Sequence, residues 1–327
     1  MTVPFEKYDG AGNDFVVVDA AEGPVEDRAA FARLHCDREV GVADSATARH
    51  GADGVLFLSL DADADPARVS MTLVQPDGSI AEMCGNGARC VAAWAADRAD
   101  AATFDIDTPA GTRRAVVEGD EVAVEMGEAT FVPTEVPLAA DDPLVDATLP
   151  ELGGTPAGSL AITAVDTGVP HAVVFVDDVD AVEIDAVAPP IRHADAFPEG
   201  ANVTFADAAG ADGFRQRTYE RGVEGETRAC GTGAVAIAAA AKRLGRLPGD
   251  TADGAWVSVT PPGGELAVAV PDDNPARLRG PAERQFTGEL DVPSDDRIAG
   301  VTGEAALGVD RFDTEDGSNA EESRADR

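Results

Sequence analysis

Two cysteines begin nearly identical motifs in the two halves of the chain. Cys84 starts Cys-Gly-Asn-Gly-Ala and Cys230 starts Cys-Gly-Thr-Gly-Ala. Each motif leads into a run with helical character, at residues 88–98 and 234–244. A thiol at the start of a helix meets unpaired backbone N–H groups and the positive end of the helix dipole. We therefore expect the pKa of both thiols to lie below the usual value of about 8.5.

Several kinds of chemistry are open to such a pair. The small residues could simply let a helix pack closely on a sheet. Zinc binding is disfavoured, because the chain has no Cys-x-x-Cys pair and its histidines lack ligand spacing, so we expect no metal site. The thiols could instead form a redox disulfide. Finally, a thiolate could remove a proton from carbon while an opposed thiol donates one, which inverts a stereocentre. The presence of the motif in both halves favours this last interpretation.

The lysines bear on the cofactor that such a reaction would use. Inversion at an amino-acid α-carbon often relies on pyridoxal phosphate, which needs a Schiff-base lysine. Lys7 lies in the polar N-terminal segment, and Lys242 ends the second predicted helix, away from its cysteine. We therefore expect a reaction without a cofactor.

Polar residues near the repeated motifs could complete a site. Asn13 follows a Gly-rich stretch that could either present it to a ligand or form a plain hairpin turn. His171 occupies the matching position in the second half and could be structural or could tune a thiol pKa. Glu220 and Arg221 could be a solvated pair, or with Asn202 could bind an ammonium and a carboxylate. We favour the functional role for all of these except Asn13, which we leave open.

The remaining cysteines and the surrounding sequence give the framework. Cys36 and Cys90 are expected to be free, buried and structural. A helix is predicted at 27–35 and a polar loop at 40–51, and segment 133–156, rich in Pro, Asp and Gly, is the predicted passage between halves. Strands are predicted at 16–19, 55–60, 69–75, 104–108, 113–118 and 121–126, and again at 172–176, 202–205, 214–219, 257–260 and 265–270. Matched motifs lie at similar intervals, which indicates duplication of one unit.

Composition limits the class of protein. A chain of 327 residues is long enough for two domains. The net charge of −36 is dispersed, which predicts an acidic surface of the kind found in salt-rich cytoplasm and argues against nucleic-acid binding. The sequence has no apolar run of the roughly 18 residues that a membrane span requires, and its polar start is unlike a signal peptide. We expect a cytoplasmic protein with a disordered acidic tail.

Six motifs carry a resemblance to a known family. They are G-A-G-N-D-F (10–15), M-C-G-N-G-A-R-C (83–90), G-V-P-H-A-V (168–173), F-P-E-G-A-N (197–202), Y-E-R-G (219–222) and A-C-G-T-G-A (229–234). With these motifs the chain closely resembles the diaminopimelate epimerases over residues 7 to about 290. Members of that family interconvert LL- and meso-2,6-diaminopimelate in lysine biosynthesis, without pyridoxal phosphate.

The resemblance implies an α+β fold of two pseudo-symmetric domains. Each is a mixed, mostly antiparallel, barrel-like sheet wrapped around a central helix, with the site in the cleft between them. Residues 1–127 with about 278–293 would form the domain of Cys84, and residues 128–277 that of Cys230. The last family strand would return to the first domain, and residues 294–327 would be the acidic, disordered tail.

The resemblance also implies roles for individual residues. Cys84 and Cys230 would be the two bases, with His171 and Glu220 near the thiols as pKa-tuning residues. The expected substrate contacts are Asn13, Gln75, Asn202, Glu220, Arg221 and the backbone at Gly85, Asn86, Gly231 and Thr232. The chain departs from the common pattern at Gln75 and Val169, where many members have Asn.

Other functions remain open. A proline or hydroxyproline racemase shares the two-thiol plan, although the G-N-D-F loop and Asn86 argue against it. A thiol redox sensor or a non-catalytic binding protein would belong to a different class. The expected partner is a small-molecule substrate, with a possible homodimer.

Overall fold

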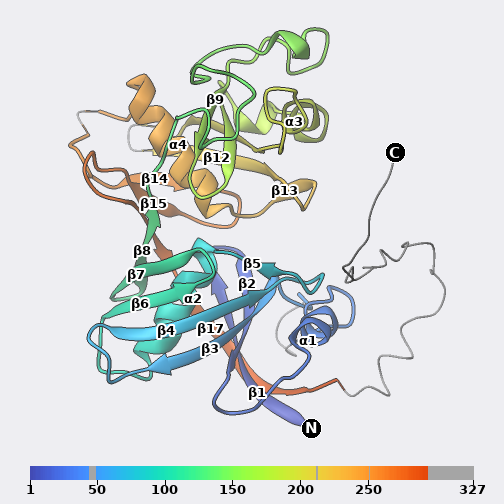
Figure 1. Cartoon of the computed structure of the whole chain (residues 1–327), viewed down its shortest axis with the longest axis vertical. Coiled ribbons are helices and arrows are strands. Elements are labelled where there is room, and N and C mark those ends of the chain that lie inside the picture. The colour runs from blue at the N-terminus through green and yellow to red at the C-terminus, as the bar shows by residue number, and fades with distance from the viewer. Residues whose placement is uncertain (44–48, 211–212, 250, 294–327) are drawn as a thin grey trace, which may run out of the picture. The chain divides into compact units, whose positions relative to one another are not determined.

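The computed structural model describes residues 1–43, 49–210, 213–249 and 251–293 (Figure 1). The tail predicted to be disordered, residues 294–327, lies outside the described residues, as does part of the loop predicted at 40–51. No helix in the described ranges is long and apolar enough to cross a membrane.

The first half is a ladder of strands around one long helix. Its strands are β1 (Thr2–Gly10), β2 (Asn13–Asp19), β3 (Gly54–Asp61), β4 (Ala67–Val74), β5 (Ile80–Ala81), β6 (Thr103–Thr108), β7 (Gly111–Glu118) and β8 (Glu121–Gly127). Helix α1 (Arg28–His35) follows β2, and α2 (Gly85–Ala96) follows β5. The pairs β2–β3 and β4–β6 are parallel, and the other neighbours in this half are antiparallel.

The second half repeats this plan. Its strands are β9 (Thr163–Asp166), β10 (Pro170–Phe175), β11 (Asn202–Ala208), β12 (Gly213–Glu220), β13 (Gly225–Thr227), β14 (Val257–Thr260), β15 (Leu266–Ala269) and β16 (Ala276–Pro281). Helix α3 (Ile184–Arg192) follows β10, and α4 (Gly231–Leu244) follows β13. Again the pairs β10–β11 and β12–β14 are parallel and the others antiparallel. Short 3₁₀ helices lie at Pro150–Leu152 and Val179–Ala181.

Element by element, the two halves therefore correspond, with α1 matching α3 and α2 matching α4. The predicted pseudo-symmetric α+β fold is confirmed. Strand β16 pairs with both β15 and β8, which joins the two ladders. The final strand β17 (Glu283–Asp291) pairs with β1, so the described chain ends in the first half. The domain boundaries at 127 and 277 stay a prediction.

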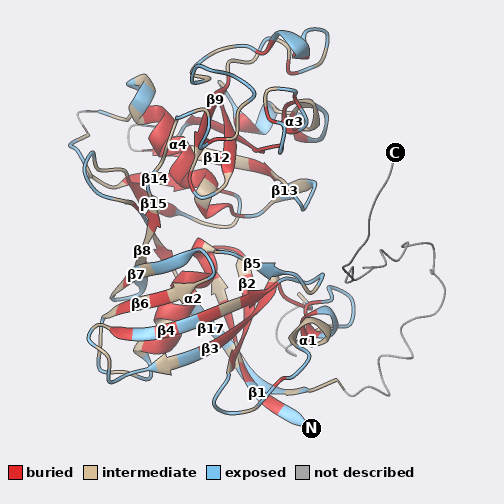
Figure 2. Cartoon of the chain, viewed as in Figure 1, coloured by how far each residue is buried: buried red, intermediate tan, exposed pale blue. Residues whose placement is uncertain are grey.

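Helices α2 and α4 form the centres of the two halves (Figure 2). Nearly every residue of α2 is buried, and in α4 every residue from 233 to 241 is buried. Both are rich in alanine, which favours helix and has a side chain small enough for surrounding strands to approach. Helix α2 contacts strands of the first half and α4 those of the second. The main hydrophobic cluster includes side chains from both helices.

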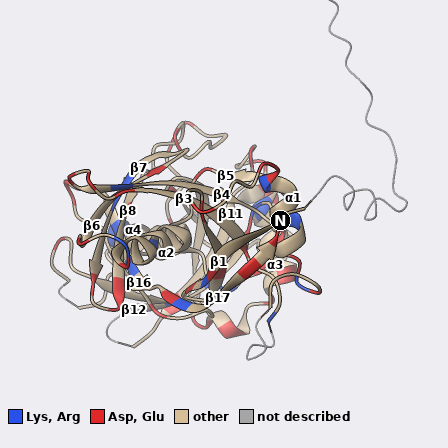
Figure 3. Ribbon diagram, turned by 90° about the horizontal axis from the view of Figure 1, so that it is seen from below, with Lys and Arg blue, Asp and Glu red and all other residues tan. Residues whose placement is uncertain are grey.

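Two smaller clusters lie under the shorter helices. One includes Phe31 of α1, and the other Ile184 and Ile191 of α3. Figure 3 shows the acidic residues of the described chain in several separate strands and loops rather than in one block.

The structure contains four strands that the sequence patterns did not predict, β5, β9, β13 and β16, and it differs from the predicted elements in other ways as well. Helices α2 and α4 begin three residues earlier than predicted, because the glycines after each cysteine are already helical despite their low helix propensity. Helix α3 was missed because it contains Pro189 and Pro190, which normally break helices. Its apolar residues at helical spacing are buried, and this packing outweighs the prolines. Strand β1 was missed because its alternation is interrupted by charged residues.

Candidate active site

One cleft with a volume of about 800 Å³ holds both cysteine motifs. It is lined by every residue predicted for the site except His171: Asn13, Gln75, Cys84, Gly85, Asn86, Asn202, Glu220, Arg221, Cys230, Gly231 and Thr232. Since these residues come from both halves, the cleft lies between the two repeated units.

Each cysteine is the N-cap residue of its central helix. Cys84 Sγ accepts a hydrogen bond from the backbone N–H of Gly87 at 3.4 Å, and the residue is partly exposed. Cys230 is buried, and its Sγ lies 3.4 Å from the hydroxyl of Thr232. Both thiols therefore lie at the positive end of a helix dipole. The other two cysteines, Cys36 and Cys90, are free and buried, as predicted.

The first residue of each helix must be glycine for the helices to approach one another. A Cβ on Gly85 would lie 2.9 Å from Met126 and 3.2 Å from Leu278. A Cβ on Gly231 would lie only 2.7 Å from the same Leu278 side chain. Leu278, on β16, is fully buried. One leucine thus packs against the starts of both cysteine-bearing helices.

The predicted direction of the thiol pKa shifts is wrong. Burial raises the pKa of Cys84, and the N–H of Gly87 and the charge of Arg89 offset this only in part. Burial also raises the pKa of Cys230 well above its ordinary value, and the negative charge of Glu220 adds to the effect. Loss of hydration disfavours the thiolate more than the helix start favours it. Of the two, Cys230 is held more firmly as a thiol.

Glu220 is the acidic group beside the thiols. Its carboxylate accepts a hydrogen bond from the hydroxyl of Thr227 and also hydrogen-bonds to Cys230. The pKa of Glu220 is raised, because the effect of burial outweighs that of these two hydrogen bonds. A thiol proton on Cys230 therefore has a carboxylate acceptor next to it.

His171 does not line the cleft, and its hydrogen-bond partners in the described structure are side chains other than the two thiols. It is fully buried, with Nδ1 3.0 Å from Thr204 Oγ1 and Nε2 3.0 Å from Thr232 Oγ1. Burial, with a smaller contribution from Arg221, lowers the pKa of His171 to about 3, so the ring is neutral near pH 7. Thr232 is therefore the link between His171 and Cys230.

Asn202 and Arg221 form a second polar group in the cleft. The side-chain oxygen of Asn202 accepts the backbone N–H of Arg221 at 2.7 Å. The guanidinium of Arg221 donates to the backbone oxygens of Glu199 and Gly200, at 3.2 and 3.4 Å. In another part of the cleft lining, the side-chain amide of Gln75 donates to the hydroxyl of Ser79 at 2.9 Å. The Gln75 amide is thus engaged locally in this structure.

Asn13 is at the end of a two-residue hairpin turn. Gly10 pairs with Asn13, and the intervening Ala11 and Gly12 have φ of 60° and 92°, as a type I′ turn requires. Both interpretations of this stretch therefore hold, since the turn also brings Asn13 to the cleft. Its side-chain oxygen accepts a hydrogen bond from Asn86 Nδ2, and its Nδ2 donates to Asp53 at 3.2 Å.

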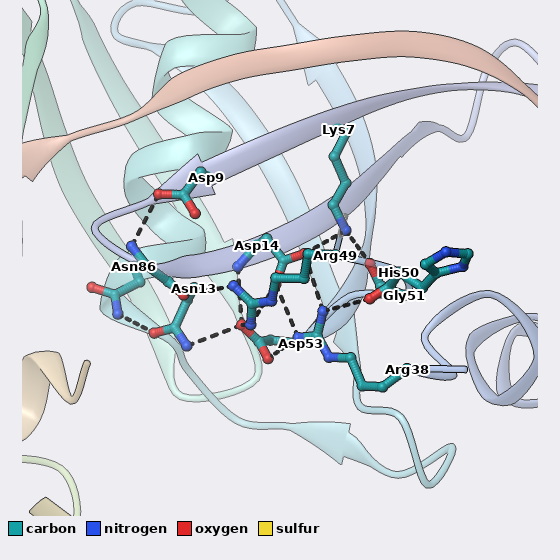
Figure 4. Close-up of polar contacts among 11 residues, drawn as sticks. Lys7, Asp9, Asn13, Asp14, Arg38, Arg49, His50, Gly51, Asp53 and Asn86 are labelled. Atoms are coloured by element: carbon teal, nitrogen blue, oxygen red, sulfur yellow. Dashed lines mark hydrogen bonds and ion pairs between the residues drawn. The ribbon is translucent and has the colours of Figure 1, made fainter. Parts of the chain in front are cut away.

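A charged network holds this hairpin (Figure 4). Buried Asp14 forms ion pairs with Lys7 at 2.7 Å, Arg38 at 2.9 Å and Arg49 at 3.0 Å. Arg38 and Arg49 also pair with Asp53. Burial alone would raise the pKa of Asp14, but the cations around it hold the pKa below its ordinary value. Through Asp53, the network sets the position of Asn13.

Sequence reasoning missed several residues of the cleft wall, among them Arg49, Asp53 and Thr227. Arg49 and Asp53 follow the polar loop and belong to no motif with known chemistry. Thr227 lies three residues before Cys230, within the segment leading to the second motif. Its position near the motif was the available indication that it could line the site.

Comparison with known proteins identifies the family. The family model for diaminopimelate epimerase matches residues 5–132 and 163–285, which include both cysteine motifs. The chain is 42% identical over 301 residues to the diaminopimelate epimerase of Methanocella arvoryzae, covering 89% of this chain and 97% of that protein. The chain belongs to the diaminopimelate epimerase family. The resemblance noted in the sequence is thus confirmed.

A second relative supports the same family assignment, and a solved structure shows the same fold. The Archaeoglobus fulgidus diaminopimelate epimerase is 40% identical over 297 residues, covering 89% of this chain and 97% of that protein. Among solved structures, a Bacillus anthracis phenazine biosynthesis protein of the PhzF family aligns with a TM-score of 0.64 at 16% identity. That alignment covers 89% of this chain and 99% of the other, and it shows a shared fold.

Proposed function

We propose that this protein interconverts LL- and meso-2,6-diaminopimelate as a step of lysine biosynthesis. The observation that carries the proposal is the pair of cysteines that cap two equivalent helices and line one cleft. Membership of the diaminopimelate epimerase family supplies the substrate.

In the proposed reaction, each thiol acts on one face of the α-carbon. A thiolate removes the α-proton, and the opposed thiol delivers its own proton to the other face. The first cysteine ends as a thiol and the second as a thiolate, so charge and protons balance. The raised pKa of both groups makes the thiolate scarcer but more basic, which suits removal of a weakly acidic proton.

We assign the resting thiolate to Cys84. Its Sγ already accepts a backbone N–H, and the charge of Arg89 lowers its pKa. Arg89 is fully buried and forms no ion pair among the described residues, although the more distant charge of Asp9 acts on it. Cys230 instead hydrogen-bonds to Glu220, whose negative charge favours the thiol.

The helix starts would hold the carboxylate of the reacting centre. The backbone N–H groups of Gly85–Asn86 and Gly231–Thr232 lie at the N-terminal ends of α2 and α4, where anions bind well. The same donors would stabilise the charge that develops when the α-proton leaves. The side-chain oxygen of Asn86 is buried without a partner in the described structure, so it can accept a hydrogen bond from the substrate ammonium.

The distal end of the substrate would lie against the other polar groups. Arg221 would pair with its carboxylate and Glu220 with its ammonium, with Asn202, Asn13 and Gln75 as further contacts. Gln75 would first have to leave Ser79.

The proposed reaction does not use a Schiff-base lysine. Lys7 is buried and paired with Asp14, and Lys242 is paired with Asp253 and Asp272. Neither lysine lines the cleft. The cleft is lined by the two thiols and by the carboxyl groups of Asp53, Glu82, Glu220 and Glu226, of which Glu220 hydrogen-bonds to Cys230.

The decisive experiment follows α-hydrogen exchange in deuterium oxide with LL-diaminopimelate and no added pyridoxal phosphate or metal. We expect early product to carry deuterium at the inverted carbon while recovered substrate stays mostly protiated, because a thiol holds one exchangeable proton. Cys84→Ala and Cys230→Ala should each abolish turnover in both directions, whereas Cys36→Ala, which lies outside the cleft, should retain it. Proline and hydroxyproline serve as control substrates. Early product that is largely protiated, or turnover by either of the first two variants, would contradict the two-base proposal.

A further inference from the structure

Behind Cys230 lies a row of buried polar side chains that the reaction above does not use. Gln216 and Thr218 lie on β12 and Thr204 on the adjacent β11, and each is at most 2% exposed. They connect to His171 on β10 and, through it, to Thr232 at the start of α4. Neither Gln216, Thr218 nor Thr204 lines the cleft.

The orientation of the Gln216 amide determines which group donates and which accepts in each hydrogen bond of this row. Gln216 Nε2 donates to the backbone oxygen of Cys230 at 3.0 Å and to Thr218 Oγ1 at 2.9 Å. Since a carbonyl oxygen can only accept, the amide cannot be flipped without placing two acceptors together. Thr218 therefore receives a hydrogen bond from Gln216 and has its own proton to donate.

The direction then follows from one hydroxyl to the next. Thr218 donates to Thr204 Oγ1 at 3.2 Å, and Thr204 donates to His171 Nδ1 at 3.0 Å. A ring nitrogen that accepts has no proton, so the neutral His171 carries its proton on Nε2. Nε2–H donates to Thr232 Oγ1 at 3.0 Å, which leaves the Thr232 hydroxyl to donate to Cys230 Sγ.

One contact opposes this direction. The Asn202 Nδ2 group lies 3.4 Å from His171 Nε2, and its amide orientation is fixed by the bond from Arg221 N–H. A proton on Nδ1 would satisfy that contact, but it would reverse the row and leave the Thr218 hydroxyl proton without an acceptor in the described structure. A buried donor without a partner costs more than a long, weak hydrogen bond gains.

The row is also closed in by helix α4. A Cβ on Gly233 would lie 2.7 Å from Gln216 Nε2, 3.1 Å from Thr218 Oγ1 and 3.2 Å from Thr204 Oγ1. The helix backbone therefore packs directly on these three side chains. This close packing fixes their spacing.

We propose that Gln216, Thr218 and Thr204 are positioning residues that fix the His171 tautomer and so make the Thr232 hydroxyl a donor to Cys230. Because Thr232 donates to the sulfur, the proton of Cys230 is directed toward Glu220 and the cleft. When Cys230 gives up its proton, the same hydroxyl stabilises the thiolate. This inference rests on the proposed function for its catalytic meaning, but the tautomer itself can be measured without any substrate.

The first test measures the His171 tautomer in the wild-type protein. Nitrogen-15 NMR of histidine-labelled protein distinguishes Nε2–H from Nδ1–H, and a His171→Gln variant assigns the signals. We expect the Nε2–H form near pH 7. Finding the Nδ1–H form would overturn the proposal, whether or not the protein is an epimerase.

The second test reverses the direction of the hydrogen bonds along the row by a nearly isosteric substitution. In Gln216→Glu the buried acid is expected to be protonated, and its O–H would still donate to the Cys230 carbonyl. The oxygen that replaces Nε2 has one proton instead of two, and with that proton on the Cys230 carbonyl it can only accept from Thr218, so His171 should switch to the Nδ1–H form. Turnover should fall about tenfold or more, because Cys230 loses a donor to its charged form. An unchanged tautomer in this variant would refute the proposed direction.

A matched pair at Thr218 separates the hydrogen bond from simple packing. Thr218→Val keeps the shape and removes the hydroxyl, so both tautomers should be populated. Thr218→Ser keeps the hydroxyl and should retain the Nε2–H form. Identical tautomer populations in the two variants would contradict the proposal. Failure of the epimerase assay with the expected tautomers would instead contradict the proposed function alone.

Discussion

Replacing Leu278 by alanine should weaken both the fold and the alignment of the two thiols. The side chain is fully buried, and it packs against the first residues of α2 and α4, Gly85 and Gly231. Removing it leaves a cavity where the two helix starts meet. Leu→Ala changes at such sites cost about 3–5 kcal/mol. In a chain of this length each kcal/mol lowers the melting temperature by about 2 °C, which predicts a drop of about 6–10 °C.

The same change should lower turnover, since the helix starts carry the cysteines. A shift of even 1 Å in reacting groups can cost about 100-fold in rate. The assay compares melting by calorimetry with kcat for LL-diaminopimelate at a temperature where the variant is folded. Leu152→Ala is the matched control, because Leu152 is buried in the separate cluster under α3 and lies outside the cleft. It should lower the melting temperature while retaining kcat. Equal kcat in both variants would refute the role of Leu278 in aligning the thiols.

Two further predictions concern pH and salt. The pKa of His171 is about 3 in the folded protein and about 6.5 in an unfolded chain. Below pH 6.5 the unfolded state therefore binds a proton that the folded state does not, and the free energy of unfolding decreases as the pH is lowered. At pH 4 this difference lowers the free energy of unfolding by about 3 kcal/mol. His171→Gln should therefore flatten the dependence of melting temperature on pH between 6.5 and 4. An equally steep dependence in that variant would contradict the assignment. The net charge of −36 should make melting temperature and activity rise from dilute buffer to molar potassium chloride, whereas a melting temperature independent of salt would contradict adaptation to a salt-rich cytoplasm.

Local sequence patterns predicted the elements whose stability is local. Helix α1 lies within one residue of its predicted range, and Asp27 is its N-cap, whose side chain accepts the N–H of Ala30 at 2.8 Å. The alanine-rich runs predicted α2 and α4 because both propensity and burial favour helix there. The duplication was visible because both halves keep the same motif order. Helix α3 escaped prediction because its stability comes from burying Ile184 and Ile191 rather than from propensity.

The contacts that tune the site could not be predicted in the same way. Asp53 reaches Asn13 across 40 positions of sequence, and Thr204 reaches His171 across 33. Such pairs depend on strand register, which no local pattern specifies. The ion pairs around Asp14 and the row behind Cys230 therefore emerged only with the structure.

The sequence by itself determined the chemistry available to this protein. Two cysteines at the starts of repeated helices, with few lysines, indicated paired thiols and proton transfer. Tertiary structure alone decided how those thiols behave. A helix start favours a thiolate wherever it occurs, but burial of the two thiols and the proximity of Glu220 reverse the sign of both pKa shifts. Desolvation is a property of everything packed around a group, so it depends on residues from both halves at once.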